Sequence, residues 1–130
     1  MAENVVVRPS TPTAQAYRIL HVAYTIAPLA AGIDKFFHLL TNWDQYLAPT
    51  VAQMLPVPGH TFMLAVGVIE VIAGCLVAVV PRVGAWIVAL WLFGIIANLL
   101  LIPGFFDIAL RDFGLALGAI ALARLSEEYA

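Results

Sequence analysis

The sequence predicts an all-α integral membrane protein whose four transmembrane helices form an up-and-down bundle. Hydrophobic residues make up 63% of the 130 residues, charged residues make up only 11%, and the mean hydropathy is +0.98. Soluble domains carry about 25% charged residues, so this composition excludes an ordinary soluble domain. Four apolar runs each approach the roughly 20 residues that a bilayer-spanning helix needs. The short links between them favour antiparallel neighbours.

The chain divides into a polar tail, one membrane domain and a short second tail. Residues 1–13 contain two prolines and a Ser/Thr cluster and are expected to form an exposed tail. Residues 14–125 form the membrane domain, with spans predicted at 14–40, 60–80, 85–102 and 108–125. Arg18 and His21 interrupt the first run, which continues well past the length of a signal-peptide core, so it is expected to be a retained helix. Residues 126–130 form the C-terminal tail.

The link at residues 41–58 is the longest and carries aromatic residues as well as three prolines. Residues 43–54 are predicted to form a short amphipathic helix in the membrane interface, with Trp43 and Tyr46 at headgroup level. An ordinary loop is the alternative. The next link, at residues 81–84, contains proline and glycine and predicts a tight connection.

The basic residues predict the orientation. Arg8, Arg18, Arg82 and Arg124 fall at one end of the predicted bundle, and Lys35 and Arg111 fall at the other. Because cytoplasmic loops carry an excess of Lys and Arg, both termini are expected in the cytoplasm. The expected location is the bacterial inner membrane.

Glu70 lies in the middle of the second apolar run. A carboxylate at that depth costs about 2.5–3.5 kcal/mol on insertion scales unless it is paired or protonated, so Glu70 should face other helices. Gly67 and Gly74 share its helical face, where small residues let a neighbouring helix approach closely.

Five other polar side chains are predicted to lie in the outer third of the bilayer, above Glu70. They are Asp34, Lys35, Asn98, Arg111 and Asp112. Buried charges are costly unless they pair, so the charged members are predicted to form an ionic network with Glu70. Two cations for three anions leave room for one protonated carboxyl group, and Glu70 is the deepest candidate. The network either lines a pocket for a polar headgroup such as that of a quinone, or only locks the helices together.

The histidines do not predict a haem or a metal centre. Two axial histidines must face each other at equal depth on facing helices, and His21 is placed alone near the cytoplasmic end. His38 and His60 could pair near the outer end, but both are placed at the interface and not deep in the bundle. The three remain secondary candidates for cofactor binding. No closely spaced set of His, Cys and carboxylate residues is present, so no metal site is predicted.

Other classes of function lack support in the sequence. Six basic residues without a cluster exclude nucleic-acid binding. Hydrolase and nucleotide-binding motifs are missing, so no catalytic residue is predicted. Cys75 is the single cysteine and is expected to be a small buried packing residue.

Three segments resemble the DoxX-like family of small four-helix bacterial membrane proteins. They are residues 32–36 (Gly-Ile-Asp-Lys-Phe), 67–74 (Gly-Val-Ile-Glu-Val-Ile-Ala-Gly) and 109–117 (Ala-Leu-Arg-Asp-Phe-Gly-Leu-Ala-Leu). The family's shared Lys, Glu and Arg-Asp positions fall on Lys35, Glu70, Arg111 and Asp112. One branch looks like the membrane subunit of thiosulfate:quinone oxidoreductase.

The resemblance implies a non-catalytic or quinone-associated subunit of a membrane oxidoreductase complex, without a covalently bound cofactor. Its partners would be the lipid bilayer and other subunits of that complex, and a stand-alone enzyme is not expected. Two alternatives stay open: a structural or assembly protein that packs against a larger complex, and a small proton-coupled transporter.

Overall fold

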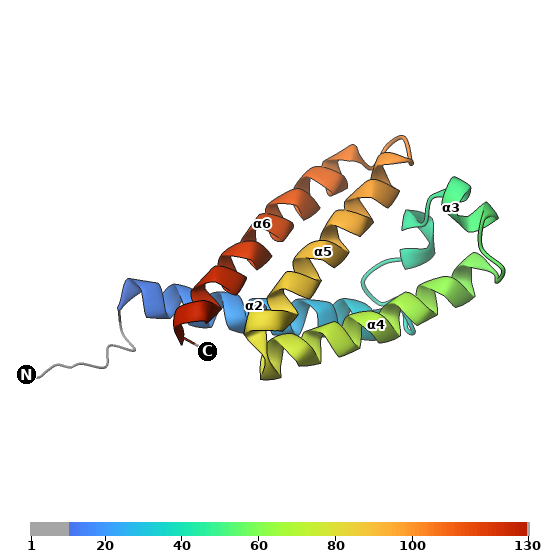
Figure 1. Cartoon of the computed structure of the whole chain (residues 1–130). Helices are drawn as coiled ribbons and strands as arrows, with labels where there is room; N and C mark the ends of the chain where they lie inside the picture. Colours follow the sequence, from blue (N-terminus) through green and yellow to red (C-terminus); the bar gives the residue numbers. More distant parts are fainter. Residues whose placement is uncertain (1–10, 130) are drawn as a thin grey trace, which may run out of the picture.

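The computed structural model describes residues 11–129, and all regular secondary structure in this range is helical. The elements, in chain order, are α2 (Pro12–Asp34), the 3-10 helix η1 (Trp43–Tyr46), α3 (Pro49–Gln53), α4 (Gly59–Val79), α5 (Pro81–Leu100) and α6 (Phe106–Tyr129) (Figure 1). Most of the expected N-terminal tail, including Arg8, lies outside the described residues.

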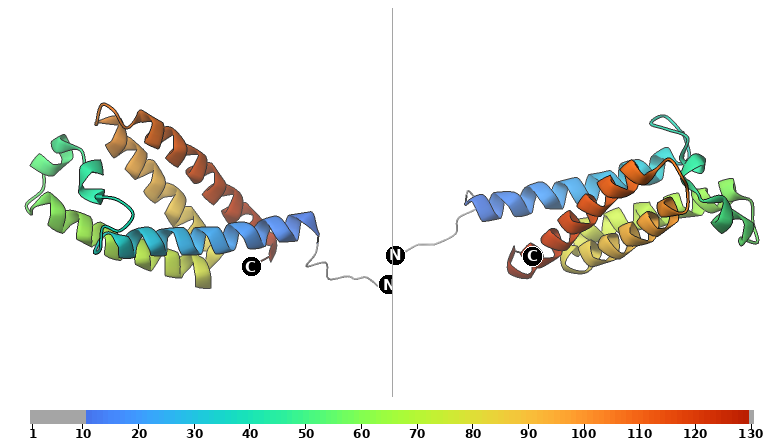
Figure 2. Two further views of the ribbon diagram at one scale, coloured as in Figure 1. Left: turned by 180° about the vertical axis from the view of Figure 1, so that it is seen from behind. Right: turned by 90° about the horizontal axis from the view of Figure 1, so that it is seen from above.

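The four long helices form two antiparallel pairs. Helix α2 packs along α4, and α5 packs along α6. The second pair leaves the first at an angle, so the pairs are close at the α4–α5 turn and diverge toward the other end (Figures 1 and 2). The segment between α2 and α4 occupies that wider end. The four helices therefore alternate in direction, as the short links predicted, but the two pairs pack against each other mainly near the α4–α5 turn.

The helices begin and end at residues with clear stereochemical reasons. Proline occupies the first position of α2, α3 and α5, where its missing N–H is not needed and its fixed φ suits a helix. Thr11 caps α2 by accepting a hydrogen bond from the Ala14 N–H at 3.2 Å. A single residue, Val80, separates α4 from α5. The predicted link at residues 81–84 is thus the first turn of α5.

The core lies where the two helix pairs converge. Small side chains from three helices dominate it, so the backbones approach closely, and Leu122 and Tyr24 fill the larger spaces. The Tyr24 hydroxyl donates to the Leu115 carbonyl at 2.6 Å and so joins α2 to α6. This junction holds the two pairs together while their far ends separate.

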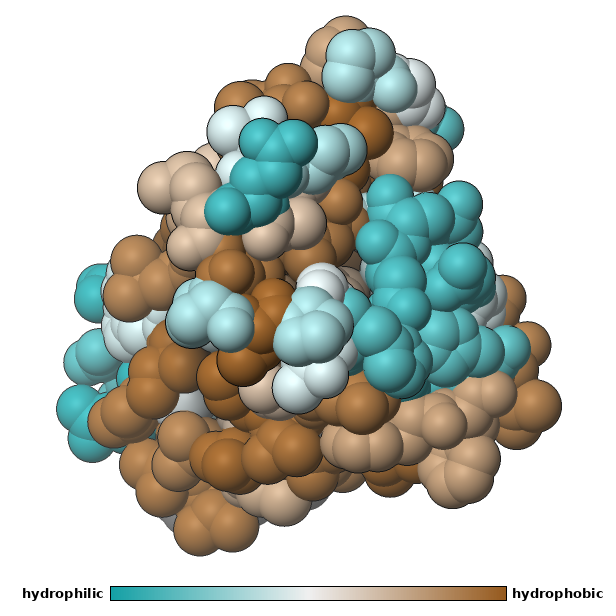
Figure 3. All heavy atoms as spheres, turned by 90° about the vertical axis from the view of Figure 1, so that its right-hand side faces the viewer, coloured by the Kyte–Doolittle hydropathy of each residue, from teal (hydrophilic) through white to brown (hydrophobic). Residues whose placement is uncertain are grey.

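Within residues 11–129, two helices are long and apolar enough to cross a membrane: α4, with a mean hydropathy of 2.5, and α5, with 2.2. Large apolar side chains point outward from the helices, such as Leu90 and Leu110 with exposed fractions of 71% and 72%. At the end that carries the α2–α4 connection, hydrophilic side chains form one large patch and smaller separate ones on a largely hydrophobic face (Figure 3). Such a surface fits contact with lipid better than contact with water.

Several predicted boundaries are wrong. The first helix stops at Asp34 instead of residue 40, because the Asp34 carboxylate accepts the N–H groups of Leu39 and Leu40, each at 2.9 Å, and folds the chain back. Residues 43–54 form two short helices, broken before Pro49, instead of one. Helix α6 continues to Tyr129, so the expected C-terminal tail is mostly helical.

Cys75 also departs from the prediction of a buried packing residue. The side chain is exposed on α4. Cys75 lies one position beyond Gly74, which faces α2, so its side chain points away from that contact.

Candidate functional site

The candidate site lies at the closest contact between α2 and α4. A Cβ atom added to Gly32 would come within 2.5 Å of the Gly67 carbonyl oxygen, and one added to Gly67 within 2.7 Å of the Gly32 carbonyl oxygen. Real Cβ atoms do not approach backbone so closely, so the two backbones can meet here only because both residues are glycine. The predicted role of Gly67 as a close-approach residue is confirmed.

A buried ion pair lies directly beside this contact. The Lys35 Nζ atom is 2.5 Å from Glu70 Oε1, and the exposed fractions of the two side chains are 4% and 10%. Lys35 caps the C-terminus of α2, three residues after Gly32, and Glu70 lies one turn after Gly67. The close helix approach therefore brings the two charges together. Each side chain supplies the opposite charge that the other needs when buried.

Trp43 and Asp34 complete the cluster. The Lys35 Nζ atom lies 4.0 Å from the centroid of the Trp43 ring, a cation–π contact. The Trp43 indole Nε1–H donates to Asp34 Oδ2 at 2.8 Å. Asp34 also accepts backbone N–H groups, including those of Leu39 and Leu40, so its buried charge is satisfied by N–H donors instead of by a cation. The Trp43 ring, predicted to lie at the level of the lipid headgroups, thus also covers the Lys35 ammonium group.

Arg111 and Asp112 do not join this cluster. Arg111 donates from Nε and Nη2 to Asp112 Oδ1 at 3.1 and 3.0 Å, and the exposed fraction of its side chain is 63%. Both residues belong to α6, which has diverged from the α2–α4 pair at this level (Figure 1). The predicted single network is thus two separate ion pairs among the described residues. The sequence could not show this, because it depends on the angle between the helix pairs.

Asn98 serves the segment between α2 and α4. Its Nδ2 donates to the Tyr46 carbonyl at 2.5 Å, and its Oδ1 accepts the Ala48 N–H at 2.9 Å. Tyr46 also packs its ring against Phe105, at 4.9 Å between centroids. The segment is therefore attached to α5 on one side, through Asn98, and to Lys35 on the other, through Trp43.

None of the three predicted anions lacks a partner in the described part of the chain. Each of the three predicted anions has found a stabilising partner: Glu70 pairs with Lys35, Asp112 with Arg111, and Asp34 with N–H donors. The sequence offers two cations for three anions, and Asp34 is the anion that hydrogen bonds stabilise in place of a cation.

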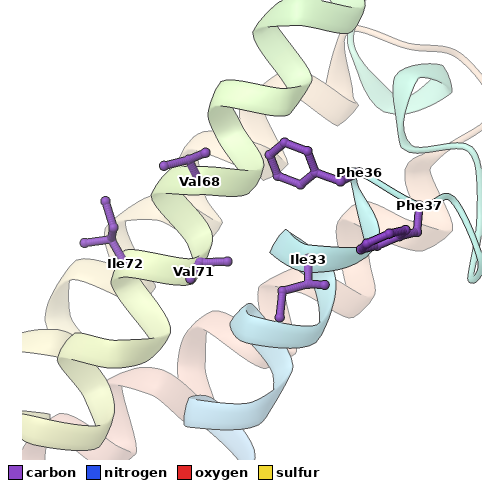
Figure 4. Close-up of a pocket in the computed structure, with 6 residues that line it drawn as sticks. All are labelled: Ile33, Phe36, Phe37, Val68, Val71 and Ile72. Carbon is purple, nitrogen blue, oxygen red and sulfur yellow. The ribbon is translucent and has the colours of Figure 1, made fainter.

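An apolar groove lies on the outer side of the α2–α4 contact. It has a volume of 390 Å³ and is lined by Ile33, Phe36, Phe37, Val68, Val71 and Ile72 (Figure 4). The lining residues flank Lys35 and Glu70 in sequence, so the groove and the ion pair occupy the same level of the two helices. The size is within the range of small-molecule sites, and the lining suits a hydrocarbon chain.

The three histidines fall at two ends of the molecule. His21 Nε2 lies 2.8 Å from the Val77 carbonyl oxygen, near the α4–α5 turn. His38 and His60 meet at the opposite end, with ring centroids 5.8 Å apart. His60 Nδ1 also lies 2.7 Å from Asp44 Oδ2. The sequence did not single out Asp44, because it is separated from the two histidines by an irregular segment whose path is set only by tertiary contacts.

Comparison of the chain with known proteins finds no matching family model, no matching curated protein and no matching solved structure. The likeness to the DoxX-like family therefore rests on the segments around Lys35, Glu70 and Arg111 alone.

Proposed function

We propose that this chain is a four-span membrane protein that serves as a non-catalytic, quinone-associated subunit of a membrane oxidoreductase complex. The observation that carries the proposal is the apolar groove of Ile33, Phe36, Phe37, Val68, Val71 and Ile72 at the level of the buried Lys35–Glu70 pair. A prenylated quinone combines a long hydrocarbon tail with a small polar head, and the groove matches the tail.

The four-span arrangement is supported by helix length and charge placement. Helices α2 and α6 contain 23 and 24 residues, about 35 Å at 1.5 Å per residue, enough to cross a bilayer beside α4 and α5. The charges of α6 lie in its first two and last two turns and leave residues 113–123 uncharged.

Charge placement also supports an orientation. Arg82 lies 3.5 Å from Glu127, and Tyr17 stacks on Tyr129, so the start of α2, the α4–α5 turn and the end of α6 share one end of the molecule. Arg18, Arg82 and Arg124 belong to these segments, whereas Lys35 and Arg111 belong to the other end. By the positive-inside rule, the first end faces the cytoplasm of a bacterial inner membrane.

The pairing of the buried charges supports a non-catalytic role. Lys35 and Glu70 neutralise each other under the Trp43 ring, so neither side chain presents a free group to a reactant. The pair fixes the two helices that form the groove. Electron transfer would then be carried by the quinone and by partner subunits, which agrees with the DoxX-like resemblance.

The decisive experiment is native isolation followed by quinone extraction. The protein, extracted at natural abundance in a mild detergent, should co-purify with flavin, haem or iron–sulfur subunits and with a quinone. Ile72→Trp, which fills the groove, should deplete the quinone, whereas Leu90→Trp on the outer face of α5 should not. A species that contains only this chain and no quinone would overturn the proposal.

A second candidate is an assembly protein that packs against a larger membrane complex. It is favoured by the open face of the α5–α6 pair, where a Cβ added to Gly94 or Gly114 would meet nothing within 4 Å. A partner helix could approach closely there. Co-purification of other subunits without quinone, lost in Gly94→Leu, would support this candidate instead.

A further inference from the structure

Three metal-ligating side chains converge at the end of the molecule that carries the α2–α4 connection. His38 follows α2, Asp44 lies in η1, and His60 is the second residue of α4. One ligand atom from each side chain lies within 4.8 Å of the other two. No metal site was predicted from the sequence, because Asp44 follows His38 by six residues of irregular chain whose path back to His38 only the structure shows.

Two buried polar atoms in this set have no hydrogen-bond partner. Nε2 of His38 and Oδ1 of Asp44 are both shielded from solvent without a partner among the described residues. The other carboxylate oxygen, Oδ2, is already 2.7 Å from His60 Nδ1. Buried polar atoms are nearly always satisfied, because leaving them unpaired is costly. A cation held by both unpaired atoms would remove that cost.

The backbone at His38 is held in an unusual conformation. Its φ is 55°, and His38 is the only residue other than glycine with a positive φ in the described part of the chain. Asp34 fixes the following residues by accepting the N–H groups of Leu39 and Leu40. Such conformations persist only where surrounding contacts enforce them, and they are concentrated at functional sites.

We propose that His38, Asp44 and His60 form a binding site for a divalent transition-metal ion of the Zn²⁺ class. Two imidazoles and one carboxylate are ligands typical of zinc and of iron(II), and the nitrogen donors disfavour Ca²⁺ and Mg²⁺. Metal–ligand bonds of about 2.1 Å require ligand atoms no more than about 4.2 Å apart, so at most a small inward movement completes the site. The His60 side chain is 55% exposed, which gives an ion access from water.

The bound ion would also act on the neighbouring ion pair. Asp44 adjoins Trp43, whose ring covers the Lys35 ammonium group. A metal held by the end of α2, η1 and the start of α4 would fix Trp43 in this position. The site thus controls the order of the segment that closes over the Lys35–Glu70 pair, a role independent of any bound quinone.

The test is Zn²⁺ titration of the detergent-purified, chelator-treated protein in competition with a chromogenic chelator. The wild type should bind one Zn²⁺ per chain. His60→Ala and Asp44→Ala should each weaken binding by more than about 100-fold, beyond the 10–100-fold effect of losing an outer hydrogen-bond partner. His21→Gln is the matched control, because His21 contacts Val77 near the α4–α5 turn, away from the proposed site, and it should bind Zn²⁺ as the wild type does.

A spectroscopic readout separates a built site from incidental binding. Co²⁺ should give a visible ligand-field spectrum with the wild type and with His21→Gln, and not with His60→Ala. Zn²⁺ should change the tryptophan fluorescence of the wild type, and Trp43→Phe should abolish that change. Equal Zn²⁺ affinity in the wild type and His60→Ala, or loss of binding in His21→Gln, would overturn the proposal.

Discussion

The Trp43 ring lies over the Lys35 ammonium group, at 4.0 Å from Nζ to the ring centroid, while its indole N–H is bound to Asp34. One side chain from the connection between α2 and α4 thus contacts two adjacent buried charges of opposite sign. It does so from a short 3-10 helix that Asn98 ties to α5. The connection therefore covers the Lys35–Glu70 ion pair. It also links the α2–α4 pair to α5 at the end where the two helix pairs diverge.

Trp43 substitutions should separate these contacts. Trp43→Phe keeps a ring over Lys35 but removes the donor to Asp34, so we expect a loss of about 1.5–3 kcal/mol in the free energy of unfolding. Trp43→Ala should cost a further ~0.5–2 kcal/mol through loss of the cation–π contact, besides the lost packing. Unfolding in detergent followed by circular dichroism measures both. Trp86→Phe, at a residue 40% exposed, is the control, and an equal loss there would contradict the assignment.

The Lys35–Glu70 pair should show a strong double-mutant effect. Lys35→Met leaves the Glu70 carboxylate buried without a cation, and such a change typically costs about 3–5 kcal/mol of stability. Adding Glu70→Met should recover most of this loss, because no buried charge then remains. The same unfolding measurement applies.

An exposed ion pair provides the matched comparison. Arg82 and Glu127 are 3.5 Å apart, with side chains 53% and 45% exposed, so Arg82→Met should change stability by about 1 kcal/mol or less. For the buried pair, the contradicting result would be a double variant whose loss of unfolding free energy equals the sum of the losses in Lys35→Met and Glu70→Met. The two side chains would then not stabilise each other.

The Gly32–Gly67 contact should not tolerate a side chain. Gly67→Ala places a methyl group 2.7 Å from the Gly32 carbonyl oxygen and must push α2 away from α4. We expect a loss of about 1–3 kcal/mol, as for other overpacked sites. Gly94→Ala meets open space and should be neutral or stabilising by up to about 1 kcal/mol, since alanine favours a helix. Equal tolerance at both positions would mean that the helices are not in close contact.

Asn98 should control the order of the segment at residues 41–58. Asn98→Ala removes both side-chain hydrogen bonds to the backbone of Tyr46 and Ala48. Because Ala48 is buried, its N–H loses its partner without access to water, which costs about 1–3 kcal/mol. Amide hydrogen exchange across residues 41–58 should become faster. Gln53→Ala, at an exposed position in α3, should leave the exchange unchanged.

Cys75 offers a direct test of membrane insertion. A nitroxide label on this single cysteine, which is exposed on α4, should face lipid. In reconstituted vesicles, its spectrum should therefore respond to oxygen, which partitions into the bilayer, and not to a water-soluble paramagnetic nickel complex. The opposite response would place this face of α4 in water.

Composition and hydropathy were sufficient to predict an all-helical chain and the approximate positions of its four long helices. Because a charge in an apolar run is costly, Glu70 was predicted to face the other helices. Gly67, on the same helical face, predicted a close contact with a neighbouring helix. Both expectations depend on one helix and its immediate neighbour, where the helical period fixes which side chains share a face. Lys35, at the end of the preceding helix, was correctly expected nearby.

The sequence by itself therefore determined an all-helical chain and a buried Glu70 with Lys35 nearby. Only the tertiary structure decided which charges share a site. The angle between the helix pairs separates Arg111 and Asp112 from Glu70. The irregular path after Asp34 brings Trp43 over Lys35. The same path places Asp44 beside His38 and His60. Such placements depend on contacts between distant segments and on the crossing of helix pairs, neither of which leaves a periodic trace in the sequence.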